Sequence, residues 1–299
     1  DLVVVSDTRV FRARLLGRRL PTGGGAECFL LARLGGDRWE ALVSPGAKLH
    51  VGAEIEFDDA ERAPGVRLRA AIVDHGARGR RVVAFTCSGI DSVDAAIDAL
   101  GHVPLPPYIR RADTAEDRLR YQTVYARESG SVAAPTAGLH FDEATLAALT
   151  ARGIRRASVT LHVGYGTFKP VTVERAEDHV VDHEPYEISP ATAQAIAETR
   201  ARGGRIVAVG TTTTRALEHA ARLHGGTVDP GAGVADLFIH PGHTFAVVTG
   251  LLTNFHLPKS SLLMLVSAFG GHACIMAAYR DAVARGYRFY SYGDAMVIL

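Results

Sequence analysis

The spacing of apolar positions changes near residue 90, and this change predicts two kinds of structure. From about residue 10 to residue 88, short apolar segments such as ECFLLARL and VRLRAAIV are separated by glycine-rich turns. Turn signals at such short intervals favour a small antiparallel β-barrel or sandwich. No residue cluster in this region has a catalytic pattern. We therefore expect an inserted antiparallel β-barrel domain over residues 11–88, following a first strand formed by DLVVV.

Beyond residue 90, helical periodicity alternates with strand-like runs. The segment DSVDAAIDALG predicts a helix with an aspartate cap and a glycine stop. Helical periodicity continues over 114–127, 142–152, 190–202, 212–223, 260–269 and 273–285. The strand-like runs between several of these helices are RRASVTLHVG, GRIVAVG, HTFAVVTGLLT and YRFYSYGDAMVI. This alternation predicts an α/β fold with a mixed sheet, in a discontinuous domain over 1–10 and 89–299.

Composition is typical of a soluble globular enzyme, with 47% apolar and 22% charged residues among 299. The net charge of +1 does not predict nucleic-acid binding, which usually accompanies a basic domain, although a local patch is compatible with it. The three cysteines are far apart and form no CxxC pair, so neither a disulfide framework nor a structural zinc site is expected. This cysteine usage fits a reducing cytoplasm.

The dense apolar run Leu262–Phe269 is too short to span a membrane, which takes roughly 18–20 residues. The chain shows no signal peptide and no initiator methionine, which suggests that a leading segment is missing. We expect a cytoplasmic protein that does not contact a membrane.

Polar residues recur where predicted strands end, which is where open α/β sheets bind ligands. The strand RIVAVG runs into TTTTRALE, where Gly210 permits a tight turn and the threonines can cap the next helix. Free N–H groups at that helix start suit a carboxylate or phosphate, with Arg215 near enough to help. The alternative is that the threonines only cap the helix and Arg215 lies on the surface. The local pattern favours neither interpretation.

Two further segments have the same character. In LHVGYGTFKPV, Gly164 and Gly166 allow close approach of the backbone to a ligand, although a hairpin or bulge is the commoner explanation. His162 falls within the strand, where a core histidine is at least as plausible as a catalytic one. In APTAGLHF, only Thr136 and His140 are polar, and such a loop suits the apolar face of an adenine or a thioether.

The segment LLTNFHLPKSSLLMLVSAFGG combines a polar half with an apolar half. Ser260 or Ser261 can cap a helix over Leu262–Phe269, which is apolar on nearly all sides and therefore predicted to be buried. Asn254, His256 and Lys259 precede this helix and follow a strand. We interpret this polar lead-in as the functional half.

His179 and His183 stand four residues apart in EDHVVDHE, a spacing that can bind a divalent metal if the segment is helical. Without a third fixed ligand the signal is weak. A pH-sensitive ion-pair cluster is the favoured interpretation, and no metal site is expected.

Eight motifs in register then resemble one known family. They are DTRVFRARLLG, GHVPLPPYI, YQTVYA, APTAGLHF, LHVGYGTFKPV, VGTTTTRALE, LTNFHLPKSSLLMLVSAFGG and YSYGDAM. In these motifs the chain resembles the S-adenosylmethionine:tRNA ribosyltransferase-isomerases of queuosine biosynthesis. The resemblance implies an α/β domain interrupted by a small β-barrel, which agrees with the independent pattern.

The resemblance also implies the reaction. The ribosyl group of S-adenosylmethionine is transferred and isomerised onto the aminomethyl group of 7-aminomethyl-7-deazaguanine in a tRNA anticodon, giving epoxyqueuosine, adenine and methionine. S-adenosylmethionine is a substrate, and no metal or redox cofactor is implied. The expected partners are such a tRNA and S-adenosylmethionine, and a monomer is expected.

This chemistry needs a base for the C5′ proton, assistance to adenine departure and a neutral attacking amine. The candidate catalytic residues are His140, His162 and His256, with Asp7 or Asp294 to orient a histidine or hold the ribose hydroxyls. The candidate S-adenosylmethionine-binding residues are Pro135, Thr136, Ala137, Gly138, Gly164, Gly166, Thr167, Gly210, Thr211, Thr212, Arg215, Thr253 and Asn254. The candidate tRNA-binding residues are Arg9, Arg110, Arg111, Lys169 and Lys259.

Three alternatives stand beside this interpretation. They are a non-catalytic RNA-binding protein, a metal-dependent hydrolase using His179 and His183, and a related enzyme that acts on a free deazapurine. The near-zero net charge counts against the first.

Overall fold

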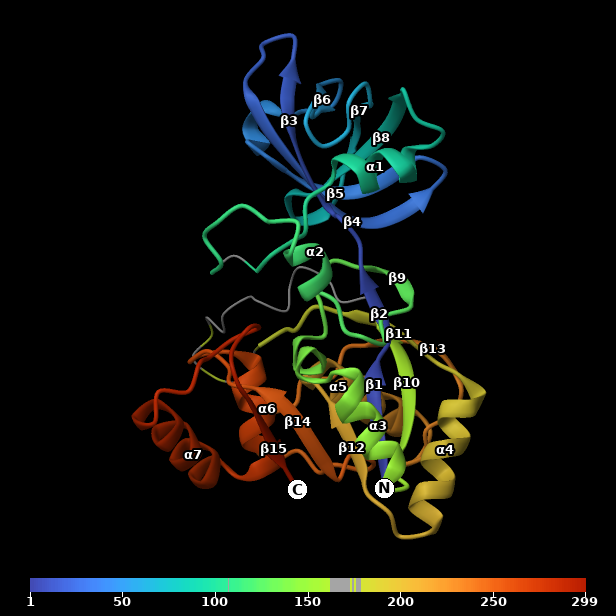
Figure 1. Ribbon diagram of the computed structural model, residues 1–299, viewed down its shortest axis with the longest axis vertical. Coiled ribbons are helices and arrows are strands. Elements are labelled where there is room, and N and C mark those ends of the chain that lie inside the picture. Colours follow the sequence, from blue (N-terminus) through green and yellow to red (C-terminus); the bar gives the residue numbers. More distant parts are fainter. Residues whose placement is uncertain (107, 162–172, 174, 176–178) are drawn as a thin grey trace. The chain divides into compact units, whose positions relative to one another are not determined.

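A computed structural model of the chain describes residues 1–299 except residue 107, residues 162–172, residue 174 and residues 176–178. The chain divides into two compact units. The larger unit comprises Asp1–Arg9 and Arg120–Leu299, and the smaller unit comprises Val10–Leu119. Figure 1 labels the helices and strands of each unit.

The larger unit is built on a mixed sheet, which is seven-stranded in the described part of the chain. Its strand order is β13 (Gly231–Ala235), β11 (Glu184–Ile188), β10 (Arg155–Leu161), β1 (Leu2–Ser6), β12 (Ile206–Val209), β14 (Gly250–Asn254) and β15 (Ala295–Ile298). Strands β10, β1, β12 and β14 run parallel, whereas β11, β13 and β15 pair antiparallel with their neighbours. The carboxyl ends of the parallel strands therefore meet at one edge of the sheet.

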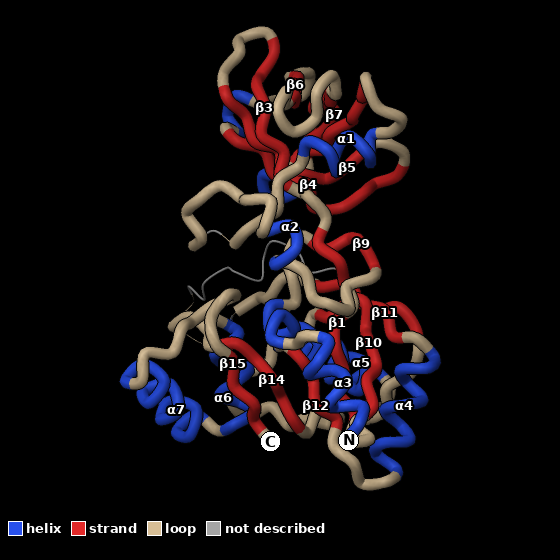
Figure 2. Tube along the Cα trace, viewed as in Figure 1, coloured by secondary structure: helices blue, strands red, loops and turns tan. Residues whose placement is uncertain are grey.

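Helices cover both faces of this sheet, as Figure 2 shows by its colours. On one face α4 (Pro190–Ala201) and α5 (Thr211–Leu223) pack against Leu2 and Val4. On the other face, η3 (Thr136–His140) and α3 (Glu143–Ala151) pack against Val3 and Val5. Because successive side chains of a strand point to opposite faces, a strand covered on both sides must be apolar throughout, as the LVVV run of β1 is.

The remaining helices of the larger unit, α6 (Ser261–Gly270) and α7 (His272–Ala284), pack around Leu251 and Phe255. Ser260 caps α6 by accepting a hydrogen bond from the Leu263 N–H at 3.2 Å, as predicted. Gly271 ends the helix with a φ of 78°. The predicted burial of the whole apolar run is only partly correct, because the fully buried positions of α6 are Leu265, Val266 and Ser267.

The smaller unit contains a closed antiparallel barrel, as the turn pattern predicted. Its strand order is β3 (Arg14–Leu20), β4 (Gly25–Gly35), β5 (Arg38–Ser44), β8 (Arg81–Ser88), β7 (Arg67–His75) and β6 (Glu54–Asp58). Short helices η1 (Gly46–Lys48), η2 (Ala77–Gly79), α1 (Val93–Leu100) and α2 (Asp117–Arg120) complete this part of the chain. Strands β2 (Thr8–Val10) and β9 (Glu128–Ser131) form a separate two-stranded ribbon.

The smaller unit extends beyond the boundary expected at residue 88. The barrel's last strand ends at Ser88, but the compact unit continues to Leu119. Arg62 Nη2 donates to the Gly101 carbonyl at 3.1 Å, and His102 Nδ1 lies 2.5 Å from Asp113 Oδ1. The Arg62 bond joins residues 39 positions apart and holds the segment after α1 against the barrel, whereas the His102–Asp113 contact lies within that segment.

Two helix predictions were wrong in detail. The helix expected over 114–127 is reduced to α2, since Tyr121 and Thr123 beyond it are buried in the larger unit instead. The first helix after the barrel is capped by Ser92, which accepts from the Ala95 N–H at 3.1 Å, and not by the preceding aspartate.

Among the described residues, no single helix has both the length and the apolar composition needed to cross a membrane. Helices α6 and α7 reach that length and composition only as a pair, and they are bent by 114° relative to each other.

Candidate active site

The carboxyl edge of the sheet brings together residues that are distant in sequence. Asp7 follows β1, Gly210 follows β12, and Asn254 ends β14. Asn254 is in register with Ala295 of the antiparallel strand β15, so Asp294 reaches the same edge. The strand order therefore gathers four of the predicted site residues.

Asn254 joins two loops at this edge. Its Oδ1 accepts a hydrogen bond from Thr136 Oγ1 at 2.9 Å, and its Nδ2 donates to the Tyr290 carbonyl at 3.3 Å. Asn254 is 3% exposed. Both ends of the amide are therefore engaged inside the protein, and the predicted contact of Asn254 with a ligand stays a prediction.

The PTAGLH loop, Pro135 to His140, lies over the ends of the parallel strands. Ala137 packs with Val5 and Val209, and Pro135 and Gly138 are buried. A Cβ built on Gly210 would lie 3.9 Å from the Ala137 Cβ. These contacts bring the predicted loop and the predicted turn side by side.

His140 links this loop to the loop before β15. Its Nδ1 lies 3.1 Å from the Ala137 carbonyl oxygen, and its Nε2 lies 3.0 Å from the Gly293 carbonyl oxygen. In this arrangement both ring nitrogens of His140 are occupied.

Asp294 closes its own loop with Arg288. The Arg288 backbone N–H donates to Asp294 Oδ2 at 2.7 Å, and Arg288 Nη2 donates to Oδ1 at 2.8 Å. The hydrogen bond from the Arg288 guanidinium holds the pKa of Asp294 below its ordinary value. Within this loop Tyr290 has a φ of 74°, a strained conformation for an aromatic residue.

Asp7 is a buried carboxylate at the end of β1, with 3% of its surface exposed. It accepts hydrogen bonds from Arg127 Nη2 at 2.6 Å and from Thr160 Oγ1 at 2.9 Å. Its backbone carbonyl also accepts from the Arg127 N–H at 2.7 Å. Asp7 is therefore held in place from both neighbouring segments, and its carboxylate is charge-balanced.

His256 follows β14 and contacts Thr253, the strand's penultimate residue. The Thr253 Oγ1 is 2.7 Å from His256 Nε2, and the His256 backbone N–H donates to Tyr279 Oη at 2.8 Å. Burial lowers the pKa of His256 to about 4. The ring is therefore neutral at pH 7 and is fixed by a hydroxyl on one side.

Helix α5 begins directly after Gly210, whose φ of 92° confirms the predicted need for glycine there. The prediction that the threonines cap this helix was wrong, because Gly210 is the cap and no side chain caps the first turn. Thr211 and Thr212 lie within the first turn, and Thr214 Oγ1 donates back to the Gly210 carbonyl at 3.1 Å. The start of α5 therefore presents backbone N–H groups at the site edge.

Arg215 is buried, so the surface interpretation was wrong. Its guanidinium donates to Glu184 Oε2 at 2.8 Å and to the carbonyls of Leu237, Asp182 and Ala235. These bonds tie α5 to β11 and β13. The predicted contact of Arg215 with a substrate carboxylate stays a prediction, and it would have to be made in addition to this internal network.

The predicted tRNA-binding residues fall in different parts of the chain. Arg9 and Lys259 are exposed in the larger unit. Arg110 and Arg111 are exposed in the smaller unit, where Arg111 donates to both carboxylate oxygens of Asp117, at 2.5 and 2.8 Å. Lys169 lies outside the described residues, as do the predicted site residues His162, Gly164, Gly166 and Thr167.

The described residues contain no group of three His, Cys, Asp or Glu side chains that could hold a metal ion. Residues 179–183 are not helical, so the spacing that would place His179 and His183 on one helix face is not formed. The ring of His179 instead packs edge-on against Phe238, with the ring centroids 5.1 Å apart.

Several residues at this edge were missed from the sequence. Thr160 and Arg127 hold Asp7, and Tyr279 holds the His256 backbone. Thr123 and Tyr125 lie against Gly138. The motif YQTVYA was the one available sequence signal for Thr123 and Tyr125. Thr160, Arg127 and Tyr279 lie in segments whose sequences do not indicate which residue they contact.

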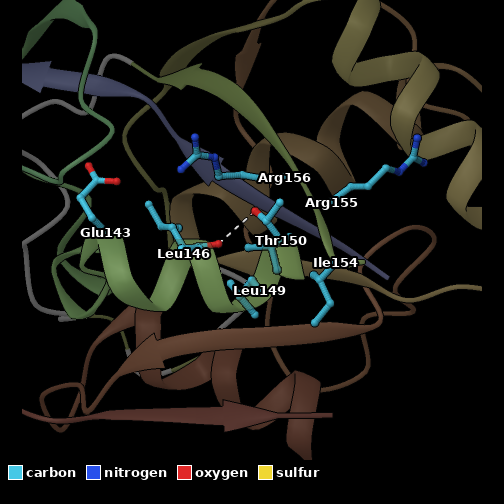
Figure 3. Close-up of a pocket in the computed structure, with 9 residues that line it drawn as sticks. Glu143, Leu146, Leu149, Thr150, Ile154, Arg155 and Arg156 are labelled. Atoms are coloured by element: carbon cyan, nitrogen blue, oxygen red, sulfur yellow. Dashed lines mark hydrogen bonds between the residues drawn. The ribbon is translucent and has the colours of Figure 1, made fainter. Parts of the chain in front are cut away.

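A separate cavity of about 370 Å³ lies between α3 and the sheet. Figure 3 shows Arg155 and Arg156 extending in opposite directions from β10, as consecutive residues of a strand must. Arg155 reaches α4, where Nη1 donates to Glu198 Oε2 at 2.8 Å. Arg156 instead lies over the ring of Tyr125, 5.6 Å from its centroid. The cavity wall is thus continuous with the packing around Tyr125.

Comparison with known proteins places this chain in a family. The family model described as queuosine biosynthesis protein matches residues 1–298. The S-adenosylmethionine:tRNA ribosyltransferase-isomerase of Heliobacterium modesticaldum is 50% identical over 299 residues, covering 100% of this chain and 85% of that protein. The protein of the same name from Anaeromyxobacter dehalogenans is 52% identical over 302 residues, covering 100% of this chain and 84% of that protein.

Among solved structures, the S-adenosylmethionine tRNA ribosyltransferase of Thermotoga maritima is 36% identical and has a TM-score of 0.48. That match covers 100% of this chain and 82% of the Thermotoga maritima chain. From the match of the family model over residues 1–298 and the relatives at 50% and 52% identity, the chain belongs to the queuosine biosynthesis protein family.

Proposed function

We propose that this chain is an S-adenosylmethionine:tRNA ribosyltransferase-isomerase. It transfers and isomerises the ribosyl moiety of S-adenosylmethionine onto 7-aminomethyl-7-deazaguanine in a tRNA anticodon and releases adenine and methionine. The observation that carries the proposal is the identity of about half of all positions, over the whole chain, with relatives that bear this name. The gathering of Asp7, Gly210 and Asn254 at one sheet edge supports it, because that edge is where such folds bind ligands.

Within this proposal two elements at the sheet edge, the PTAGLH loop and the start of α5, bind different parts of S-adenosylmethionine. The PTAGLH loop, with Ala137 packed on Val5 and Val209, offers an apolar surface for the adenosyl group. The first turn of α5 offers N–H groups of Thr211 and Thr212 to the methionine carboxylate, which the positive end of a helix dipole favours.

We assign the proton transfers and the polar contacts of the reaction to titratable side chains at the carboxyl edge of the sheet. His256 is the candidate acceptor for the C5′ proton, since burial keeps its ring neutral and Thr253 fixes its orientation. Asp7 is the candidate partner for ribose hydroxyls, since its carboxylate lies at the end of β1 and is held there by Arg127 and Thr160. His140 holds the PTAGLH loop against Gly293 and thereby positions the surface on which the adenine rests.

The proposal also covers the contacts with tRNA, the oligomeric state, the location in the cell and the need for a cofactor. The exposed side chains Arg9, Arg110, Arg111 and Lys259, together with Lys169, contact tRNA phosphates. The enzyme works as a monomer in the cytoplasm without a metal or redox cofactor. Chelation tests the last point, because retained turnover in EDTA is expected and lost turnover would favour a metal-dependent hydrolase using His179 and His183.

The direct test is incubation of the purified chain with S-adenosylmethionine and tRNA that carries the deazaguanine precursor. We expect epoxyqueuosine in the digested tRNA, with one adenine and one methionine released for each nucleoside formed. A parallel arm supplies the free deazapurine, which we expect to remain unchanged. The absence of both adenine release and a mass gain on the tRNA would overturn the proposed function.

A further inference from the structure

Two residues of the motif YQTVYA, Thr123 and Tyr125, have buried hydroxyls that the site described so far does not use. Thr123 is 5% exposed, and its Oγ1 has no hydrogen-bond partner among the described residues. The Tyr125 Oη is also buried and without a partner in the same part of the chain. A buried hydroxyl without a partner is uncommon in native proteins, because its lost hydration is not replaced. Two of them two positions apart call for an explanation.

Both residues lie against the PTAGLH loop. A methyl group at position 138 would overlap the Tyr125 Oη and would come within 2.9 Å of the Thr123 Cγ2. Only glycine therefore allows the loop to approach the two side chains this closely. The same loop is bonded to Asn254 through Thr136. The two hydroxyls are thus part of the sheet edge where we place the substrate.

The surroundings of Tyr125 fix its ring. Arg156 lies over one face, 5.6 Å from the ring centroid, and Phe141 meets the ring edge-on with centroids 6.4 Å apart. Figure 3 shows the Arg156 side chain extending away from Arg155 on its own side of β10. Burial raises the pKa of Tyr125, so the phenol stays protonated and can donate a hydrogen bond. The ring is therefore held, while its hydroxyl has no hydrogen-bond partner among the described residues.

We propose that Thr123 and Tyr125 form a subsite for the adenosyl part of S-adenosylmethionine, with the two hydroxyls bonded to its neutral nitrogen and oxygen atoms. This inference rests on the proposed function. The hydroxyls are uncharged and adjoin the apolar cluster of Val5, Ala137 and Val209. A carboxylate or ammonium group would lose much hydration there without an opposite charge beside it, whereas a heteroaromatic ring and ribose hydroxyls lose little. The Arg156 guanidinium covers the face of the Tyr125 ring.

The test compares Tyr125→Phe and Thr123→Val by calorimetric binding and by thermal unfolding. For each variant we expect a Kd for S-adenosylmethionine raised about ten-fold by the loss of one hydrogen bond. We expect the Tm of the free protein to stay unchanged or to rise, because the hydroxyl removed had no partner. Tyr279→Phe is the matched control, since its hydroxyl accepts from the His256 N–H, and its Tm should fall.

Two further ligands separate the parts of the substrate. 5′-Methylthioadenosine retains the adenosyl group and should lose the same ten-fold in both variants, whereas binding of methionine should not change. A loss seen with S-adenosylmethionine alone would place the contacts on the amino-acid part and overturn the assignment. Unchanged Kd values with a lowered Tm would make the hydroxyls structural and overturn it as well. Failure of the wild-type chain to bind S-adenosylmethionine would instead overturn the proposed function.

Discussion

The Thr253 hydroxyl and the His256 imidazole lie 2.7 Å apart at the end of β14, with the oxygen facing Nε2. Burial lowers the pKa of His256 to about 4, so the ring is neutral at pH 7. A neutral ring has one nitrogen that accepts and one that donates, and the Thr253 hydroxyl can serve either. The pair therefore fixes the position of the imidazole, and the hydroxyl can bond either tautomer.

Removing the Thr253 hydroxyl should lower turnover more than stability. Thr253→Val keeps the shape of the side chain but leaves His256 Nε2 without its partner. We expect kcat to fall about ten-fold, which corresponds to about 1.4 kcal/mol, while Thr253→Ser retains most of the activity. The measurement is steady-state turnover with S-adenosylmethionine and precursor tRNA. Equal kcat values for wild type and Thr253→Val would show that the pair does not assist the reaction.

Acid should destabilise the folded chain through His256. Its pKa in the folded state is about 4, below the ordinary value of 6.5, so the unfolded state takes up the proton first as the pH falls. The contribution of His256 to the free energy of unfolding is constant above pH 6.5. It decreases as the pH falls from 6.5 to 4 and changes no further below pH 4. Between pH 7 and pH 4.5 we expect a loss of about 2–3 kcal/mol that is absent in His256→Gln.

Denaturant unfolding of both proteins at these two pH values measures this difference. His224→Gln is the control, because it removes an exposed histidine and should keep the acid loss of the wild type. An equal loss in wild type and His256→Gln would show that other groups cause the acid sensitivity.

Glu218 should be a major structural residue of the larger unit. Its carboxylate is 2% exposed and accepts hydrogen bonds from the N–H groups of Ala246, Val247 and Val248, at 2.8, 3.0 and 2.8 Å. Hydrogen bonds to a charged group contribute more than neutral ones, so Glu218→Gln should lower the free energy of unfolding by about 3 kcal/mol.

Glu198→Gln is the control for Glu218, because Glu198 is 41% exposed and its ion pair with Arg155 is largely screened. We expect a change below about 1 kcal/mol for this variant, measured by the same urea unfolding. Similar losses for the two variants would contradict the role assigned to the three N–H groups.

Gly138 and Tyr125 should be energetically coupled. A methyl group at position 138 would overlap the Tyr125 Oη, so Gly138→Ala must displace the ring or the loop. We expect a loss of about 2 kcal/mol in unfolding free energy for Gly138→Ala. The double variant with Tyr125→Phe should recover part of that loss, because the overlapping oxygen is gone while the ring carbon remains 3.2 Å away. A double-mutant cycle measures the coupling, and strictly additive losses would contradict the contact.

The sequence by itself determined the classes of structure and the positions of most elements. Alternating apolar runs and helical periods predicted the α/β unit, and closely spaced glycine turns predicted the barrel, because both patterns arise from local burial. Gly210 was identifiable for a local reason, since its φ of 92° is one that only glycine adopts easily. The eight motifs indicated the family before any geometry was known.

Tertiary structure alone decided which residues meet. The order of the parallel strands brings Asp7 to the edge shared with Gly210 and Asn254, and no local pattern encodes that order. Arg215 was expected to face a ligand or the solvent, and its buried network with Glu184 depends on strands that approach it only in the fold. His140 and Gly293 are 153 positions apart and share one hydrogen bond. Local sequence sets which segments are strands and helices, whereas hydrogen-bond partners at the site are set by packing between segments distant along the chain.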